Sequence, residues 1–420
     1  MENLTKFIHP RQANPDAPAA FAPWPHFDCE EIEAVTSVLR SGKVNYWTGE
    51  QGRQFENEFA QSIGVEHAVC VANGTVALEL ALHALGIGPG DEVITSSRTF
   101  IASASCAAMR GAKPVFADAD PNSQNVTAET IDQAITAKTK AIIAVHLAGW
   151  PCDMDPILRL AARQNLRVIE DCAQAQGALY RGRPVGSMGD AAAFSFCQDK
   201  IMTTGGEGGM LATNDPEIWK RAWSLKDHGK SYDAVYHREH PPGYRWLHET
   251  IGSNWRMTEM QAAIGRVVLR KVPGWVISRR RHASALTDQL SRLPALRVPV
   301  PPDHCYHSYY KYYAFVRPEM LKPGWNRDAI IAAIQAEGVP CFAGSCSEIY
   351  LERALAYARP RCRLPVAKEL GETSLMFAVH PTLTDEHIAL TRRVVKRVMD
   401  QSTRRSPLYR PFASAATSGC

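Results

Sequence analysis

Short apolar runs alternate with helical stretches along the first half of the chain, and this alternation constrains the fold more than any other feature. The apolar runs are Ala68 to Val71, Glu92 to Thr95, Pro114 to Ala117, Lys140 to His146 and Leu166 to Glu170. Strands separated by helices require crossover connections, which join parallel strands covered on both faces. We therefore predict an α/β fold whose ligands bind in the loops at the carboxyl ends of the strands.

A later apolar run, Ala191 to Phe196, is followed by a polar segment that carries one lysine, Lys200. The run has the length of a buried strand, and the glycine-rich stretch Gly205 to Gly209, which includes Glu207, indicates a tight turn. An amine at the end of a buried strand is held partly out of water, which lowers its pKa and lets the neutral form attack a carbonyl. A lysine at such a position is also often a solvated surface charge, so this segment alone leaves both interpretations open.

Two earlier loops could act together with this lysine. Asn73-Gly74-Thr75 lies between a strand and a helix, where free backbone N–H groups and a hydroxyl can hold a phosphate dianion, although the same tripeptide is a common helix cap. Asp171 follows the strand Leu166 to Glu170, and a carboxylate there can pair with a protonated ring nitrogen or simply cap a helix.

The glycine-rich stretches do not indicate a nucleotide cofactor. Gly86 to Gly90 follows a helix and has the proline of a turn, unlike a dinucleotide-binding loop. Gly205 to Gly209 lacks the Gly-Lys-Ser/Thr ending of a P-loop. Neither stretch predicts NAD or ATP.

Charge and cysteine usage limit the possible partners. The chain has 47 Lys and Arg against 43 Asp and Glu, a net charge of +4, and its local basic clusters are typical of solvated helix faces, so we expect no nucleic-acid partner. No apolar stretch approaches the length of a membrane span, so we expect no membrane partner and a cytoplasmic location. The 11 cysteines form no Cys-x-x-Cys pair, and we expect no metal site.

Five motifs in one order resemble the DegT/DnrJ/EryC1/StrS family of sugar aminotransferases, from about Phe27 to about Val398. They are Asn73 to Leu78, Gly88 to Ile94, Glu170 to Ala175, Ser195 to Gly209 and Asn254 to Met257. The resemblance implies a pyridoxal-phosphate-dependent fold of type I, similar to aspartate aminotransferase. Such a fold has a mostly parallel seven-stranded sheet and a smaller α+β C-terminal domain.

The resemblance also implies roles around the cofactor. Lys200 would carry pyridoxal 5′-phosphate, and Asp171 would keep the pyridine nitrogen protonated so that the ring accepts electrons. Gln174 would contact the ring hydroxyl, and Phe100 would stack on the ring, unless it is an ordinary core residue.

A second group of residues would bind the cofactor's phosphate. Gly74, Thr75 and Ser195 belong to it, although Ser195 is also consistent with a buried hydroxyl bonded to backbone. Asn254 would join them from the other subunit of a homodimer with shared active sites.

The resemblance implies amino transfer from glutamate to a nucleotide-linked keto-deoxy sugar, at C4, for surface polysaccharide or amino-sugar biosynthesis. A cyclitol (inosose-type) aminotransferase and a non-catalytic ligand-binding regulator remain alternatives. Trp47, Glu207 and Ser345 are candidate sugar contacts.

The chain departs from the family pattern in two places. Gln176 stands where the family often has histidine, and Cys197 to Asp199 is an unusual approach to the lysine. We expect these departures to affect the substrate rather than the cofactor.

The sequence also suggests a division into domains. We expect a large domain with an N-terminal arm over residues 1–265, a small domain over 266–405 and a mobile tail over 406–420. The long helical segment Met260 to Leu290 is predicted to be interrupted near Pro273, and Asp28 with Glu31 resembles a capping box.

Overall fold

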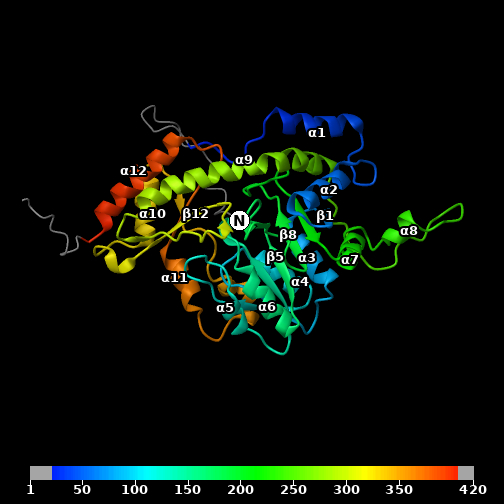
Figure 1. The fold of residues 1–420 in the computed structure, drawn as a ribbon, viewed down its shortest axis with the longest axis horizontal. Coiled ribbons are helices and arrows are strands. Elements are labelled where there is room, and N and C mark those ends of the chain that lie inside the picture. Colours follow the sequence, from blue (N-terminus) through cyan, green and yellow to red (C-terminus); the bar gives the residue numbers. More distant parts are fainter. Residues whose placement is uncertain (1–20, 405–420) are drawn as a thin grey trace, which may run out of the picture.

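The computed structural model describes residues 21–404 of the chain. The tail predicted for 406–420 and the first part of the N-terminal arm lie outside these residues. Two sheets organise the described part, one of seven strands and one of four, and a long helix runs past both (Figure 1).

The large sheet has the strand order β1-β9-β8-β5-β4-β2-β3. Four neighbouring pairs are parallel, and only β9 runs antiparallel to its two neighbours. The mostly parallel seven-stranded sheet is therefore confirmed. Its strands are β1 (His67–Val71), β2 (Glu92–Ser96), β3 (Lys113–Ala117), β4 (Thr139–Val145), β5 (Arg167–Asp171), β8 (Ala191–Ser195) and β9 (Gly209–Thr213).

Helices cover both faces of this sheet. Alternate residues of a strand point to opposite faces, and in β1 Val69 packs into one core while Cys70 packs into another. The first core is formed with α3 (Gly74–Ala84), α4 (Ala102–Met109) and α7 (Pro216–Lys226), and the second with α2 (Gln51–Ile63) and α9 (Glu259–Leu290). Burial on both faces explains why the strands read as continuous apolar runs.

The small sheet is antiparallel, with the order β10-β12-β14-β13. Its strands are β10 (Leu296–Arg297), β12 (Tyr312–Val316), β13 (Cys341–Phe342) and β14 (Ser374–Phe377), and it packs with α10 (Arg327–Ala336) and α12 (Asp385–Ser402). The start of α9 lies in the core of the large sheet and its end in this one. The domain boundary at 265/266 stays a prediction, and it falls inside α9.

The predicted interruption of α9 near Pro273 is wrong, because the helix is continuous from Glu259 to Leu290. A proline inside a helix removes one hydrogen bond and costs about 3 kcal/mol. Val268, Val272 and Val276 on either side are buried against the large sheet's core, and this burial holds the helix together across the defect.

The chain enters this architecture through α1 (Cys29–Ser41). The predicted capping box at Asp28 and Glu31 is confirmed, and Gly42 ends the helix in a left-handed conformation. The remaining helices and strands are α5 (Ala128–Asp132), α6 (Met154–Gln164), α8 (Tyr232–Tyr236), α11 (Pro365–Thr373), β6 (Leu179–Tyr180), β7 (Arg183–Pro184) and β11 (Cys305–Tyr306). Among residues 21–404, no helix combines the length and apolarity needed to cross a membrane.

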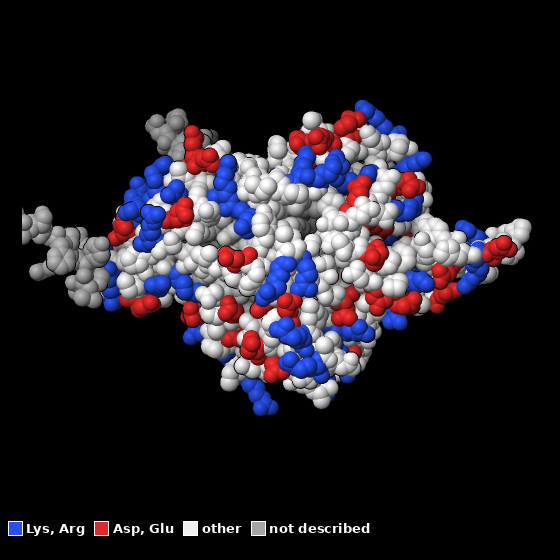
Figure 2. Space-filling view, viewed as in Figure 1, with Lys and Arg blue, Asp and Glu red and all other residues white. Residues whose placement is uncertain are grey.

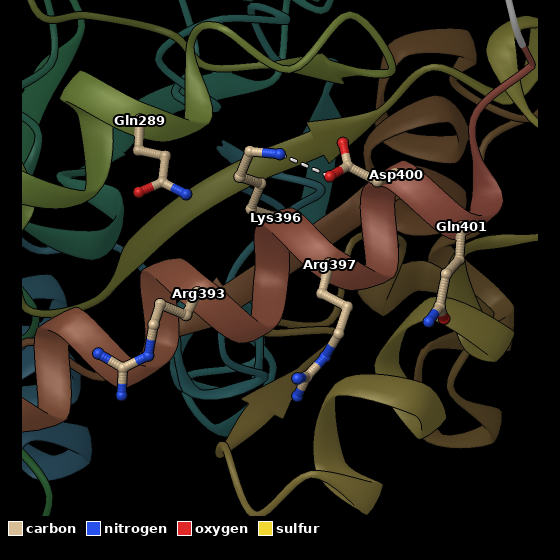
Figure 3. Close-up of a pocket in the computed structure, with 6 residues that line it drawn as sticks. All are labelled: Gln289, Arg393, Lys396, Arg397, Asp400 and Gln401. Carbon is tan, nitrogen blue, oxygen red and sulfur yellow. Dashed lines mark hydrogen bonds and ion pairs between the residues drawn. The ribbon is translucent and has the colours of Figure 1, made fainter.

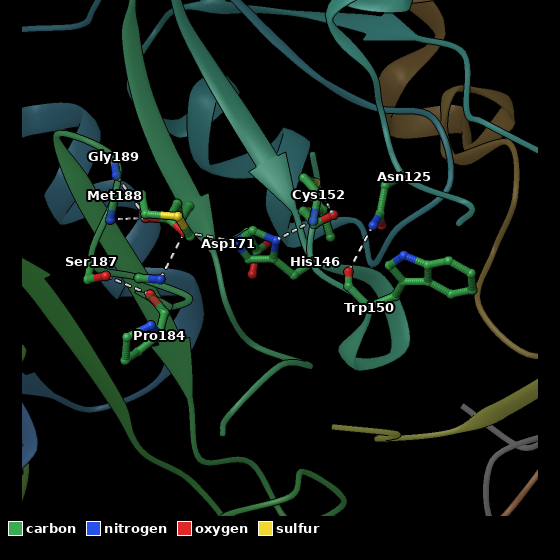
Figure 4. A network of polar contacts seen from close by, with 12 residues as sticks. Asn125, His146, Trp150, Cys152, Asp171, Pro184, Ser187, Met188 and Gly189 are labelled. Atoms are coloured by element: carbon green, nitrogen blue, oxygen red, sulfur yellow. Dashed lines mark hydrogen bonds and ion pairs between the residues drawn. The ribbon is translucent and has the colours of Figure 1, made fainter. Parts of the chain in front are cut away.

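A buried polar network fixes the carboxyl end of β5, next to Asp171 (Figure 4). The carboxylate of Glu170 accepts hydrogen bonds from the backbone N–H groups of Gly186, Met188 and Gly189 at 2.7 to 2.8 Å, and it lies 3.0 Å from Nε2 of His146. Because Nδ1 of His146 accepts the N–H of Cys152, Nε2 carries the proton that Glu170 accepts. The network therefore ties β4, β5 and the loop after β7 together.

Cys172 lies close enough to His146 and Glu170 for the three side chains to be considered as ligands of a metal ion. Both imidazole nitrogens and the carboxylate are already used in the network, and burial raises the pKa of the Cys172 thiol well above its usual value. These three side chains therefore form a structural network rather than a ligand set.

We predict that Glu170→Ala lowers the free energy of unfolding by about 3 to 5 kcal/mol, because it leaves buried N–H donors unpaired. Burial opposes ionisation of Glu170, but His146 and the backbone donors hold its pKa below the usual value. Its contribution is therefore present above the ordinary glutamate pKa and is lost as the pH falls through the lower folded pKa. Urea unfolding at neutral and acidic pH measures both effects.

Glu33→Ala is the matched control, since this α1 glutamate is exposed and contacts only Arg40 and the Ser37 hydroxyl at the surface. It should change the free energy of unfolding by less than about 1 kcal/mol. Equal losses in the two variants would contradict the role given to the buried network.

Candidate active site

A cavity of about 700 Å³ opens at the carboxyl ends of β5 and β8, beside the first turn of α3. This is where an open α/β sheet binds its ligands. Seven residues expected around a cofactor line it: Gly74, Thr75, Phe100, Asp171, Gln174, Ser195 and Lys200. Sequence motifs up to 126 residues apart thus meet in one cavity.

The first turn of α3 forms one wall. Asn73 caps the helix by accepting the N–H of Val76 at 3.0 Å, and the N–H groups of a helix's first turn have no partners within the helix. A Cβ added to Gly74 would lie 2.6 Å from Cβ of Ser195. Only glycine therefore lets the helix N-terminus approach the end of β8 so closely, and the result is a set of donors suited to an anion.

Asp171 ends β5 and is almost fully buried. Its Oδ2 accepts the hydroxyl of Ser103 at 2.7 Å and its Oδ1 accepts the N–H of Ala173 at 3.1 Å. Burial raises the pKa of this carboxyl, while the two hydrogen bonds and the charge of Lys200 oppose that change. The carboxylate is therefore oriented and would gain from a cationic partner in the cavity.

Lys200 lies on the loop that leaves β8, and its backbone is held at both sides. Its carbonyl accepts the indole N–H of Trp24 at 2.8 Å, while its own N–H donates to the carbonyl of Cys197 at 3.1 Å. The side chain is 17% exposed, and its Nζ lies 3.4 Å from Oδ1 of Asp199. The backbone of the lysine is thus fixed while its amine reaches the cavity.

Two glutamines follow Asp171 and have different roles. Oε1 of Gln174 accepts the N–H of Ala148 at 2.9 Å, and this residue lines the cavity. Gln176 instead donates from Nε2 to the carbonyl of Ser195 at 2.7 Å. Gln176, which stands where the family often has histidine, therefore supports the end of β8.

Phe100, Glu207 and Ser345 also line the cavity. The ring of Phe100 is 66% exposed, so it is not an ordinary core residue. Glu207 is exposed and approaches the thiol of Cys197, while the N–H of Ser345 donates to the hydroxyl of Tyr313 at 2.9 Å. Two of the three candidate sugar contacts thus line the cavity.

Trp47 and Asn254 do not line this cavity. Trp47 packs edge to face on Trp223, and the ammonium of Lys230 lies 4.1 Å from its ring centre. Asn254 is exposed and pairs with Asp227 through the backbone. In the single chain, these two residues therefore lie outside the cavity lining.

Three residues at the site were not identified from the sequence as site residues. Ser103 orients Asp171 from α4, Tyr310 lines the cavity from the segment before β12, and Asp199 lies beside the lysine amine. The sequence signalled only Asp199, as an unusual residue before Lys200. Ser103 lies within a helix pattern and Tyr310 within an aromatic run, and neither pattern distinguishes a site residue from a core residue.

A second hollow of about 520 Å³ lies on the outer surface between α9 and α12 (Figure 3). Its Lys396 is paired with Asp400 at 2.6 Å, and both side chains are more than half exposed. Positive and negative side chains are interspersed over the face seen in Figure 2. This hollow is a mixed-charge surface without an oriented buried group, so the cavity around Lys200 is the better candidate site.

Comparison with known proteins shows what the chain is similar to. A relative named GDP-perosamine synthase, from Caulobacter vibrioides, is 44% identical over 281 residues, which are 66% of this chain and 72% of the relative. A relative named UDP-N-acetyl-3-dehydro-alpha-D-glucosamine 3-aminotransferase, from Acidithiobacillus ferrooxidans, is 38% identical over 379 residues, 89% of this chain and 96% of the relative. The crystal structure of an aminotransferase from Psychrobacter cryohalolentis matches with a TM-score of 0.89 and 54% identity, covering 91% of this chain and 99% of that one.

The family model of the DegT/DnrJ/EryC1/StrS aminotransferases matches residues 25–399. This range includes every motif on which the resemblance was based and the seven- and four-stranded sheets of the structure. The chain is an enzyme that belongs to the DegT/DnrJ/EryC1/StrS aminotransferase family.

Proposed function

We propose that the enzyme is a pyridoxal-phosphate-dependent aminotransferase that moves an amino group from glutamate to C4 of a nucleotide-linked keto-deoxy sugar. The observation that carries the proposal is one cavity lined by Lys200, by Asp171 and by the first turn of α3. Surface polysaccharide or amino-sugar biosynthesis would use the product.

The residues present fit pyridoxal phosphate. The cofactor has a phosphate dianion, a basic ring nitrogen and a reactive aldehyde carbon, and each has a suitable partner in the cavity. The close approach of Gly74 to Ser195 forms a cradle of N–H and hydroxyl donors for the phosphate. Asp171 offers a buried carboxylate that forms no ion pair with any residue of 21–404, and Lys200 offers the amine.

When bound, pyridoxal phosphate supplies a carbon that accepts the amino group and a ring that withdraws electrons. Asp171 would hold a proton on the ring nitrogen, because a buried carboxylate favours a positive partner. Lys200 would bind the cofactor and, when its amine is free, carry a proton to and from the reacting carbon atoms. Gln174 and Phe100 would fix the plane of the ring.

The acceptor is assigned as a nucleotide sugar because both named relatives act, by name, in nucleotide-sugar chemistry. This supports a sugar over a cyclitol as the acceptor. The name of the A. ferrooxidans relative specifies amination at position 3, which makes C3 the second candidate position. Glu207 and Ser345 line the cavity and would contact the acceptor.

We further propose a homodimer with shared active sites. The segment after α8 extends away from the body of the chain (Figure 1), and it exposes large apolar side chains, among them Tyr244 at 74%, Trp246 at 80% and Ile251 at 92%. Apolar groups this exposed are typical of an interface. Asn254 follows this segment directly and would reach the phosphate of the partner's cofactor.

Lys200→Ala tests the cofactor, the lysine and the donor together. We expect the wild type to show the absorption band of bound pyridoxal phosphate and to lose it when glutamate is added, as the amino form of the cofactor accumulates. The variant should not show this band, because it lacks the amine that forms the bond. A wild-type protein that stays colourless with added pyridoxal phosphate would refute the proposed function.

Gly74→Ala should weaken binding of pyridoxal phosphate by at least about tenfold, because the added Cβ would push the first turn of α3 away from Ser195. Titration of the cofactor against the protein's fluorescence measures the change. Gly274→Ala in α9 is the matched control, since its Cβ would meet no atom within 4 Å. Wild-type affinity in Gly74→Ala would contradict the assigned phosphate site.

Intersubunit complementation tests the shared site. Lys200→Ala and Asn254→Ala should each be impaired alone, whereas an equal mixture with exchanged subunits should regain about a quarter of the wild-type sites, because half of the dimers then contain one intact site. Aminotransferase activity before and after subunit exchange is the measurement. No gain on mixing would place both residues in the site of one chain.

A further inference from the structure

We propose that Asp199 is a positioning residue for Lys200, a role that rests on the proposed function. Its carboxylate, fixed by the hydroxyl of Tyr310, holds the free amine of the lysine inside the cavity, over the Tyr310 ring.

Contacts on both carboxylate oxygens of Asp199 carry this inference. Oδ1 lies 3.4 Å from Nζ of Lys200, and Oδ2 accepts a hydrogen bond from the hydroxyl of Tyr310. The same ring lies beneath the amine, with Nζ of Lys200 5.1 Å from its centre. A carboxylate and an aromatic face therefore define one place for the ammonium group.

Tyr310 is rigid enough to serve as the anchor. It is buried, its N–H donates to the carbonyl of Ala148 at 2.8 Å, and its own carbonyl accepts from Nη1 of Arg279 at 3.2 Å. Ala148 follows β4 and Arg279 lies in α9, so the anchor is fixed by both the large sheet's loops and the long helix. Burial and the charge of Asp199 raise the pKa of the Tyr310 hydroxyl well above its usual value, so it stays a donor.

The carboxylate itself stays ionised. Burial alone would raise the pKa of Asp199, but the charge of Lys200, the hydroxyl of Tyr310 and the charge of Lys311 together lower it. Burial lowers the pKa of the Lys311 ammonium to about 8. The titratable and charged groups around the Asp199–Lys200 pair are Asp171 on β5, Cys197 and Glu207 on the same loop, Arg279 on α9, Tyr310 and Lys311 before β12, and His380 after β14.

A positioned amine has a chemical use in this reaction. Whenever its amine is not bonded to the cofactor, an unrestrained lysine side chain would sample many rotamers. A fixed carboxylate limits the amine to positions from which it can return a proton to the cofactor.

A pH titration of the cofactor's absorption band tests the inference. In Asp199→Asn, the pH midpoint for loss of the proton from the nitrogen that joins Lys200 to the cofactor should fall by about one to two units, because an opposite charge within 4 Å is removed. Asp199→Ser should give the same lower midpoint, since the lost charge is what it has in common with Asp199→Asn. Asp199→Glu should restore a midpoint close to that of the wild type.

Glu207→Gln is the matched control, because this second carboxylate lines the same cavity but contacts Cys197 rather than the lysine amine. Its midpoint should move less than that of Asp199→Asn. A wild-type midpoint in both neutral Asp199 variants, with the cofactor band present, would overturn the inference and leave the proposed function intact. Absence of the band in the wild type would instead refute the proposed function itself.

Uptake of cofactor gives a second readout that does not depend on turnover. Only the neutral amine attacks the aldehyde of pyridoxal phosphate, so the pH at which cofactor uptake reaches half of its maximal rate should be lower in cofactor-free Asp199→Asn than in the wild type, because an opposite charge beside the amine is removed. An unchanged pH dependence of uptake in the variant would contradict the inference.

Discussion

The parallel pairing of β4, β5 and β8 is the constraint on which the site depends. It brings the carboxyl ends of three strands to one edge, so that Asp171 and the loop carrying Lys200 become neighbours although 28 residues lie between them. The hydrogen bonds of Glu170 hold that edge in place, because its buried carboxylate has donors on β4 and on the loop after β7. Without this network, the strand end that orients Asp171 would have unpaired groups in the core.

Charge in the cavity is arranged to suit a ligand that is negative at one end and positive at the other. The α3 N-terminus and Ser195 supply donors on one side, and Asp171 supplies a carboxylate on another. Lys200 lies beside a second carboxylate, Asp199, which accepts a hydrogen bond from the hydroxyl of Tyr310. Such opposed environments are typical of catalytic sites, because each ionisable group is adjusted by fixed neighbours.

Much of the fold could be predicted from the sequence because periodicity reports burial directly. The apolar runs gave the mostly parallel sheet, and the spacing at Asp28 and Glu31 gave the first helix cap. The prediction of α9 was wrong at Pro273, because local propensity does not report the valines on either side of it that are buried in the core. Ser103 and Tyr310 were not predicted as site residues for a related reason, because their roles depend on contacts with segments that are distant in the sequence.

The sequence by itself determined the local chemistry: which loops follow which strands, where glycine permits close approach, and which side chains can bind or react. Those properties depend on residues near one another in the chain. Only the tertiary structure decided that Asp199 meets Tyr310, 111 residues away, and that Trp47 and Asn254 lie outside the cavity of their own chain. Side-chain contacts between distant segments depend on how whole elements pack, and no periodicity within one segment encodes that packing.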